Sequence, residues 1–115
     1  HYLTGAASWY MMTMMTEVFG VHGEAGDMVI RPKLLKEQFD ENKTASIRMF
    51  FAGKEFAVSF QNREGLEYGT YKIGRAECDG TAIQNVDDKE IIIKRNTILS
   101  MKNGLHNIIV ELVSA

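Results

Sequence analysis

A short run near the start of the chain has the residue types of an anion-binding site. Thr4-Gly5-Ala6-Ala7-Ser8-Trp9 places a hydroxyl, a glycine and small residues where a helix is expected to begin. Backbone N–H groups and the positive dipole at a helix N-terminus suit phosphate or sulfate, and Gly5 lacks the Cβ that would keep an anion away. Spacing alone favours a plainer interpretation, in which Thr4 is only an N-cap. Thr4 and Gly5 are the candidate phosphate-binding residues, with the cap as the alternative.

The other reactive residue types stand apart along the chain. His22 and His106 have no nucleophile or carboxylate at a convincing spacing, so both are expected at the surface or at a strand edge. Cys78, beside a turn, is expected to be a small buried residue rather than a nucleophile. The acidic clusters 37–41 and 87–88 are typical of solvated loops. They do not supply the two opposed carboxylates that unaided glycoside hydrolysis requires.

Aromatic side chains on the predicted strands could form a sugar-binding platform. Phe50 falls on the face opposite Phe51, and Tyr68 and Tyr71 flank Gly69. The alternative is that Phe50 packs under a helix or against another domain, and this is the interpretation that we favour, because a sandwich with an apolar outer face often has a partner on it.

The chain composition limits the function classes. A length of 115 residues suits a single core, and a net charge of -2 gives no electrostatic case for nucleic acid or an anionic membrane. One cysteine cannot form an internal disulfide, and one cysteine with three scattered histidines makes no zinc site. We therefore expect a soluble, cytoplasmic protein without a metal.

Residues 6–19 contain no glycine or proline and predict a helix that is apolar nearly all round. Such a helix is normally buried inside something larger, and the methionines at 11, 12, 14 and 15 fit core packing better than a metal site. Thr4 is a plausible N-cap and Gly20 a plausible stop. Because the chain begins at His1 with no initiator methionine or basic leader, we expect it to begin in mid-protein.

After Gly26 the hydrophobic pattern changes to the period of two that half-buried strands show. Alternating runs at 28–31, 44–51, 55–60, 71–78, 81–83, 91–93 and 108–113 predict about seven short strands. Ala52-Gly53-Lys54 and Asp79-Gly80 are typical of tight hairpin turns. We predict a mainly β chain, an antiparallel β-sandwich preceded by one apolar α-helix, with residues 1–25 as the helical part and residues 26–115 as the sandwich domain.

Four segments in this order resemble one known family. They are His1–Trp9, Gly20-Val21 with Gly26–Pro32, Phe50–Phe56, and Cys78-Asp79-Gly80. Together they are similar to the C-terminal end of glycoside hydrolase family 94, the cellobiose and chitobiose phosphorylases. In that family a Tyr-x-Thr-Gly-x-x-x-Trp segment opens the last helix of an (α/α) barrel and a C-terminal β-sandwich follows. The predicted helix would then be a remnant of that barrel.

The resemblance also implies an activity. These enzymes cleave β-linked glucosides with inorganic phosphate and invert the anomeric centre, giving an α-sugar 1-phosphate without a cofactor. An upstream Asp acts as general acid, and Thr4 with the backbone of Gly5 would contact the phosphate. Partners would be the upstream catalytic domain and a second copy in a homodimer, with no nucleic acid and no membrane. Departures at Val21-His22-Gly23 and Gly26-Asp27-Met28 leave the sugars open. The alternative function is a non-catalytic carbohydrate-binding or interaction module.

Overall fold

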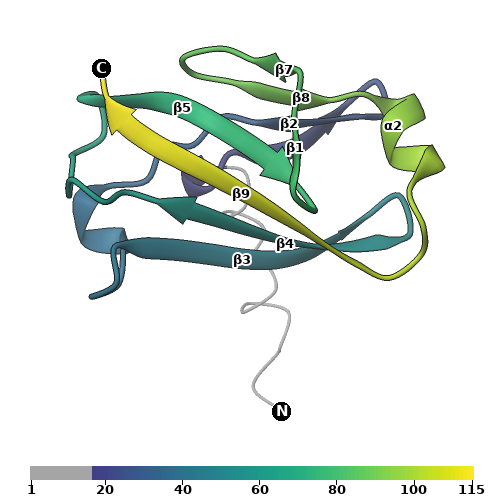
Figure 1. The fold of residues 1–115 in the computed structure, drawn as a ribbon, viewed down its shortest axis with the longest axis horizontal. Coiled ribbons are helices and arrows are strands. Elements are labelled where there is room, and N and C mark those ends of the chain that lie inside the picture. Colours follow the sequence, from purple (N-terminus) through teal and green to yellow (C-terminus); the bar gives the residue numbers. More distant parts are fainter. Residues whose placement is uncertain (1–16) are drawn as a thin grey trace.

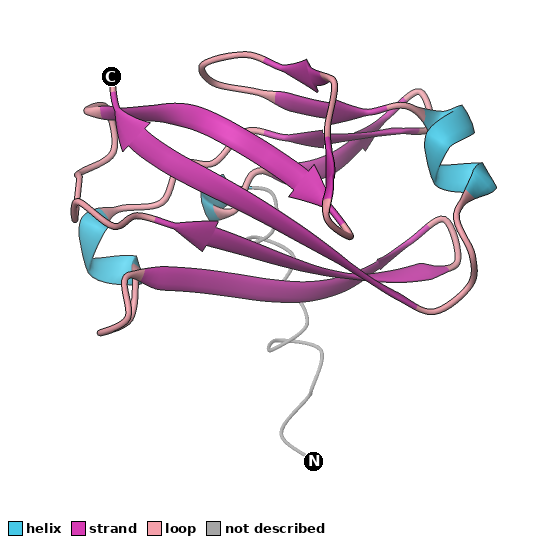
Figure 2. Ribbon diagram, in the orientation of Figure 1, coloured by secondary structure: helices cyan, strands magenta, loops and turns pink. Residues whose placement is uncertain are grey.

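The computed structural model describes residues 17–115, which form two β-sheets facing one another (Figures 1 and 2). The first sheet has the strand order β1-β2-β8-β7 and the second has the order β3-β4-β9-β5-β6. The strands are β1 Val21–Glu24, β2 Asp27–Ile30, β3 Thr44–Phe51, β4 Lys54–Gln61, β5 Tyr71–Cys78, β6 Thr81–Ala82, β7 Asn85–Val86, β8 Ile91–Ile93 and β9 Leu105–Ser114. Two short helices, η2 Lys36–Gln38 and α2 Arg95–Ser100, lie in the connections. The mainly β fold class is confirmed.

Two hairpins form where local turn chemistry predicts them. Ala52 and Gly53 have φ values of 53° and 78° and join β3 to β4. Asp79 and Gly80 have φ values of 51° and 85° and join β5 to β6. Two successive positive φ angles give a turn whose twist matches that of the flanking strands, so both hairpins are tight. Lys54, expected in the first turn, is instead the first residue of β4.

The larger sheet is mixed, whereas the sequence predicted antiparallel pairing throughout. β9 runs parallel to β4, in register from Glu55↔Leu105 to Gln61↔Glu111, and antiparallel to β5. The chain leaves β4, builds β5 and β6, crosses to the first sheet for β7 and β8, and returns through α2. β9 therefore enters from the end at which β4 begins (Figure 1). A parallel pair needs such a long crossover.

The core lies between the two sheets and follows the predicted alternation. Phe56, Val58 and Phe60 of β4 are fully buried on the side of the larger sheet. Met28 and Ile30 of β2, in the first sheet, belong to the same core. Burying one such side chain contributes roughly 1.5–3 kcal/mol. Ala45 and Met49 of β3 and Ile108, Val110 and Leu112 of β9 complete the same layer. The inward positions of β3, β4 and β9 thus follow the period of two, whereas β5 departs from it, because a register shift between Ile73 and Arg75 places its buried residues Ile73 and Ala76 three positions apart.

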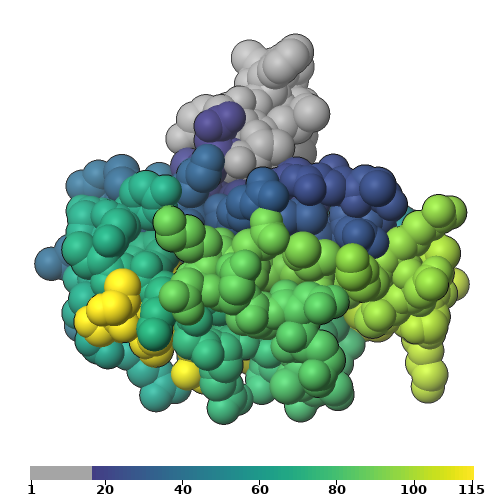
Figure 3. Space-filling view, turned by 90° about the horizontal axis from the view of Figure 1, so that it is seen from above, coloured from purple at the N-terminus to yellow at the C-terminus, as the bar shows by residue number. Residues whose placement is uncertain are grey.

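The sandwich begins earlier than the predicted boundary at residue 26. Val21–Glu24 pairs along its whole length with Asp27–Ile30, so β1 belongs to the first sheet and not to the helical part. Figure 3 shows the residues of β1 and β2 together in dark blue, next to the green residues of β8 and β7, in keeping with the strand order β1-β2-β8-β7. The predicted helix over 6–19 lies mostly outside the described residues. None of the helices in residues 17–115 has the length and apolar character needed to cross a bilayer.

Candidate functional site

The candidate phosphate residues, Thr4 and Gly5, lie outside the described residues. Within residues 17–115, reactive side chains meet at one corner of the sandwich, where the β5–β6 turn lies against the start of β9. Asp79 from the turn and His106 from β9 form the centre of this corner, and Cys78 lies beside them. Cys78 and Asp79 are neighbours in sequence, whereas His106 lies 27 positions after Asp79, and the β5–β9 pairing brings it to them.

Asp79 is held by the backbone as well as by a side chain. Its Oδ1 accepts the N–H of Asn107 at 2.8 Å, and its own N–H donates to the Asn107 carbonyl at 2.8 Å. Its Oδ2 lies 2.6 Å from Nδ1 of His106. The bond from the Asn107 amide, followed by the bond from His106, lowers the pKa of the Asp79 carboxyl. Asp79 therefore stays ionised and fixes the turn onto β9.

His106 is buried, and both of its ring nitrogens are engaged in hydrogen bonds. Its Nδ1 bonds to the Asp79 carboxylate, and its Nε2 lies 2.6 Å from the Lys102 carbonyl oxygen. Both partners are acceptors, so both ring nitrogens must donate, which requires the imidazolium form. The Asp79 bond, then the Lys102 bond, raises the pKa of His106, while the nearby cation of Lys54 opposes the shift. The expectation of a surface or strand-edge histidine was wrong, because this residue is only 8% exposed.

We predict that the Asp79–His106 pair stabilises the fold most between about pH 4 and 6.5. The contribution of Asp79, whose pKa is lowered, is lost as the pH falls through the acid range. The contribution of His106, whose pKa is raised, is lost as the pH rises through its folded value. Asparagine tolerates the φ of 51° at this position, so Asp79→Asn removes the charge without straining the turn. The substitution should lower the free energy of unfolding by about 1 kcal/mol in this pH window, because Asp79 is half exposed and solvent screens its charge.

The measurement is urea unfolding of the wild-type chain and of Asp79→Asn at about pH 3, 5 and 9. The difference between the two proteins should be largest at the middle pH and should shrink at both extremes. A difference that is constant across the range would contradict a charged pair.

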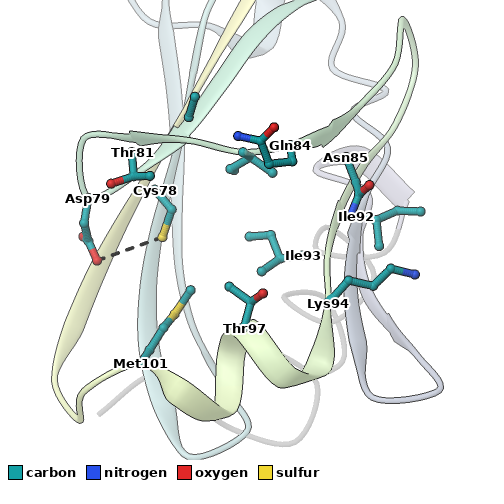
Figure 4. A pocket seen from close by; sticks show the side chains of 12 residues that line it. Cys78, Asp79, Thr81, Gln84, Asn85, Ile92, Ile93, Lys94, Thr97 and Met101 are labelled. Carbon is teal, nitrogen blue, oxygen red and sulfur yellow. Dashed lines mark hydrogen bonds between the residues drawn. The ribbon is translucent and has the colours of Figure 1, made fainter.

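A cleft of about 440 Å³ opens beside this corner, between the edges of the two sheets (Figure 4). Cys78, Ile93 and Met101 form an apolar interior, and Thr97 reaches in from α2. Polar side chains from the segment 81–85 line the rim. The cleft has the apolar floor and few polar groups of a small-molecule site. Its charged lining residues are Lys94 and Asp79, and the Asp79 carboxylate is already bonded to His106.

The thiol of Cys78 does not supply a nucleophile to this cleft. Burial, then the negative charge of Asp79, raises its pKa to about 11. Roughly one thiol in ten thousand is ionised at neutral pH at such a value. The expectation that Cys78 is inert is consistent with this environment, although its side chain is only partly buried.

We predict that iodoacetamide alkylates Cys78 in the folded chain about 100-fold more slowly than in the urea-unfolded chain at pH 8. The rate in the folded chain should keep rising with pH up to about pH 10, because the thiolate fraction is still growing there. Mass spectrometry after timed quenching measures both rates. A rate that reaches a plateau near neutral pH would indicate an activated thiolate and contradict the prediction.

No protein-family model matches the chain, and no curated protein matches it. The site is therefore interpreted from its own geometry. Among residues 17–115, no group of three or more histidine, cysteine or acidic side chains is positioned to hold a metal ion. In this described part of the chain, the only histidine–carboxylate pairs are His106–Asp79 and His22–Glu24, and the second is a surface pair on β1. The thiol of Cys78 lies 4.0 Å from Oδ2 of Asp79, but with a pKa of about 11 it stays protonated.

The aromatic residues that sequence analysis considered as a platform separate into two places. Phe50 lies on the outer face of β3 and is 75% exposed, across from the Arg48–Glu55 ion pair. Tyr68 and Tyr71 lie near the far end of the sandwich, with ring centroids 6.1 Å apart. Phe50 is therefore not packed against the described residues, and the tyrosines do not share its surface.

Proposed function

We propose that this chain is the C-terminal part of an inverting glycoside phosphorylase that cleaves β-glucosides with inorganic phosphate. One observation carries the proposal: a β-sandwich begins at Val21, directly after the segment that contains the Thr4–Trp9 motif and Gly20. This is the order that the resemblance to glycoside hydrolase family 94 implies, with the last barrel helix leading into the sandwich. The motif is a sequence observation on residues 4–9 and the sandwich is a structural observation on residues 17–115, so the two observations are independent.

In this proposal the sandwich has a structural role and the chemistry lies elsewhere. Within residues 17–115, both ring nitrogens of the buried histidine are already hydrogen-bonded and the cysteine is a protonated thiol, so neither is available as general base or nucleophile. A general acid upstream of His1 would protonate the glycosidic oxygen. Phosphate would attack the anomeric carbon from the opposite face, giving an α-sugar 1-phosphate. No cofactor is needed for this exchange.

Thr4 and Gly5 would hold the phosphate at the start of the last barrel helix. A hydroxyl and free backbone N–H groups at a helix N-terminus donate to an anion, and the helix dipole favours the negative charge. The parent protein is the longer phosphorylase of which this chain would be the C-terminal part. Its partners would be the β-linked oligosaccharide and a second copy of itself, and this chain's own partner would be the upstream catalytic domain. A cytoplasmic location fits an enzyme that consumes inorganic phosphate and releases a sugar phosphate.

The exposed ring of Phe50 is the observation that favours the second candidate, a carbohydrate-binding module. A single ring on the outer face of β3 gives one stacking surface, with an ion pair beside it. In the phosphorylase proposal, the same ring would instead pack against the upstream domain, because exposed aromatic groups on a sandwich face are often covered by a partner. Binding of neutral β-glucans by the isolated chain, lost in Phe50→Ala, would favour the module.

The test of the main proposal is an assay of the parent protein against a panel of β-linked glucobioses, with and without inorganic phosphate. Phosphate-dependent cleavage and an α-sugar 1-phosphate, identified by proton and phosphorus NMR, are the expected results. A β-sugar 1-phosphate, or cleavage that does not require phosphate, would contradict an inverting phosphorylase.

A further inference from the structure

We propose that a cationic groove at the end of the sandwich away from α2 binds a phosphorylated sugar, with Tyr68 stacking on the sugar ring and lysines holding the phosphate. The groove has a volume of about 370 Å³. It is lined from separate parts of the chain by Arg31, Lys33, Tyr68, Tyr71, Lys72 and Lys89. Ala115, which follows the end of β9, also lines the groove, and Figure 1 shows this end of the chain on the side of the sandwich opposite α2. This inference goes beyond the proposed function and does not depend on it.

The loop that carries Tyr68 is fixed before any ligand arrives. The Glu67 carboxylate accepts the N–H of Lys36 at 2.8 Å and the N–H of Tyr68 at 2.9 Å. The Thr70 hydroxyl donates to the Glu67 carbonyl at 2.6 Å, closing the turn. Because these bonds order the loop in advance, binding need not supply the free energy for ordering it.

Tyr68 offers an exposed aromatic face, while Tyr71 serves as its support. The Tyr71 hydroxyl donates to the Leu34 carbonyl at 2.9 Å, and its ring meets Tyr68 at an interplanar angle of 63°. Tyr68 remains 49% exposed. An edge-to-face contact on one side holds the ring and leaves surface free for the apolar face of a sugar.

The charge of the groove is positive although the whole chain carries a net charge of -2. Lys33, Lys72 and Lys89 have no carboxylate within 4 Å among residues 17–115, whereas Arg31 is paired with Glu24 and Glu90. Asp88 is the one acidic side chain in the described lining. In the 115-residue chain the carboxylate of Ala115 also lines the groove, so three lysines face two carboxylates and the balance stays positive. A net positive charge attracts an anion, and lysine binds phosphate as a compact point charge.

The combination of groups selects the ligand class. Lysines alone would bind any small anion, and an aromatic ring alone would bind neutral sugars weakly. A fixed ring next to unpaired ammonium groups favours a molecule that has both a ring face and an anionic group. We assign a sugar phosphate rather than a nucleotide, because a single tyrosine face provides no second surface to enclose a base.

The experiment titrates the full 115-residue chain with α-glucose 1-phosphate and follows backbone amides by NMR. Parallel titrations use glucose, inorganic phosphate and adenosine monophosphate. Glucose 1-phosphate should shift amides in residues 31–33, 68–73 and 88–89, and its affinity should exceed that of glucose and of phosphate by about tenfold or more. The affinity should fall as salt is raised, because exposed charges are screened.

Two variants and two controls complete the test. Tyr68→Ala and the double variant Lys72→Gln with Lys89→Gln should each weaken binding about tenfold. Leu105→Ala and Arg48→Gln remove an exposed apolar side chain and an exposed cation that do not line the groove, and both should leave the affinity unchanged. Circular dichroism checks that each variant is folded.

Three outcomes would overturn the inference. They are an absence of shifts in the groove, equal affinity for phosphate or adenosine monophosphate, and unchanged affinity in Tyr68→Ala. If the groove shows no shifts and the shifts are confined to residues 4–8, the result would instead support the phosphate site of the proposed function. The two proposals can therefore fail independently.

Discussion

Replacing Gly20 with alanine is expected to destabilise the fold by at least about 3 kcal/mol. Gly20 has a φ of 71°, and a Cβ at this position would lie 1.9 Å from the Arg31 carbonyl oxygen and 2.4 Å from its carbon. Both atoms are backbone, so a side-chain rotation cannot relieve the overlap. The Gly20 carbonyl also accepts the Arg31 N–H at 3.0 Å, which ties the start of β1 to the end of β2. Alanine would separate these two segments.

Gly53→Ala is the matched control, because Gly53 also has a positive φ, 78°, but a Cβ at this position would meet no atom within 4 Å. This variant should lose only about 1–2 kcal/mol, the backbone strain of the left-handed region. Urea unfolding followed by circular dichroism measures both variants. Equal losses would show that the close approach at Gly20 has no energetic consequence.

The parts of the fold that could be predicted are those set by neighbouring residues. The Asp79-Gly80 turn was predictable because both residues tolerate a positive φ, and the inward positions of β3 and β4 followed from strict alternation. The parallel β4–β9 pair was not predictable, because it joins residues about 50 positions apart through the β5–α2 crossover, and no local pattern encodes that register. β1 was missed because Val21–Glu24 is short and contains a glycine.

The contact between Asp79 and His106 could not be predicted from local sequence patterns either. The pair is 27 positions apart in sequence, and the β5–β9 register, with Cys78 opposite Ile108, brings the turn beside His106. The available signal was weak: an aspartate in a hairpin turn and a histidine near the start of an apolar strand. Tyr68 and Tyr71 were easier to associate, because three positions in one loop keep their rings close.

The second large effect is expected for Thr4→Val in the parent protein. Valine keeps the shape of threonine but removes the hydroxyl that we propose donates to phosphate. Losing a hydrogen bond to a charged group costs roughly 1.5–3 kcal/mol, which corresponds to about 10–100-fold in affinity. The loss should raise the KM for phosphate and affect the KM for the sugar much less.

Thr81→Val is the matched control, since Thr81 is an exposed threonine at the start of β6. It removes the same hydroxyl group from a residue to which the proposal assigns no phosphate contact, and it should leave both KM values unchanged. A valine N-cap also weakens a helix by about 1 kcal/mol, so thermal unfolding of both variants must accompany the kinetics.

The decisive measurement is therefore the phosphate dependence of sugar 1-phosphate formation by the parent protein, for wild type, Thr4→Val and Thr81→Val. We expect phosphorolysis in the wild type, with a phosphate KM raised at least about tenfold in Thr4→Val alone. No phosphorolysis of any β-glucoside, or a Thr4→Val enzyme with the phosphate KM of the wild type, would refute the phosphorylase proposal and leave Thr4 as a helix cap.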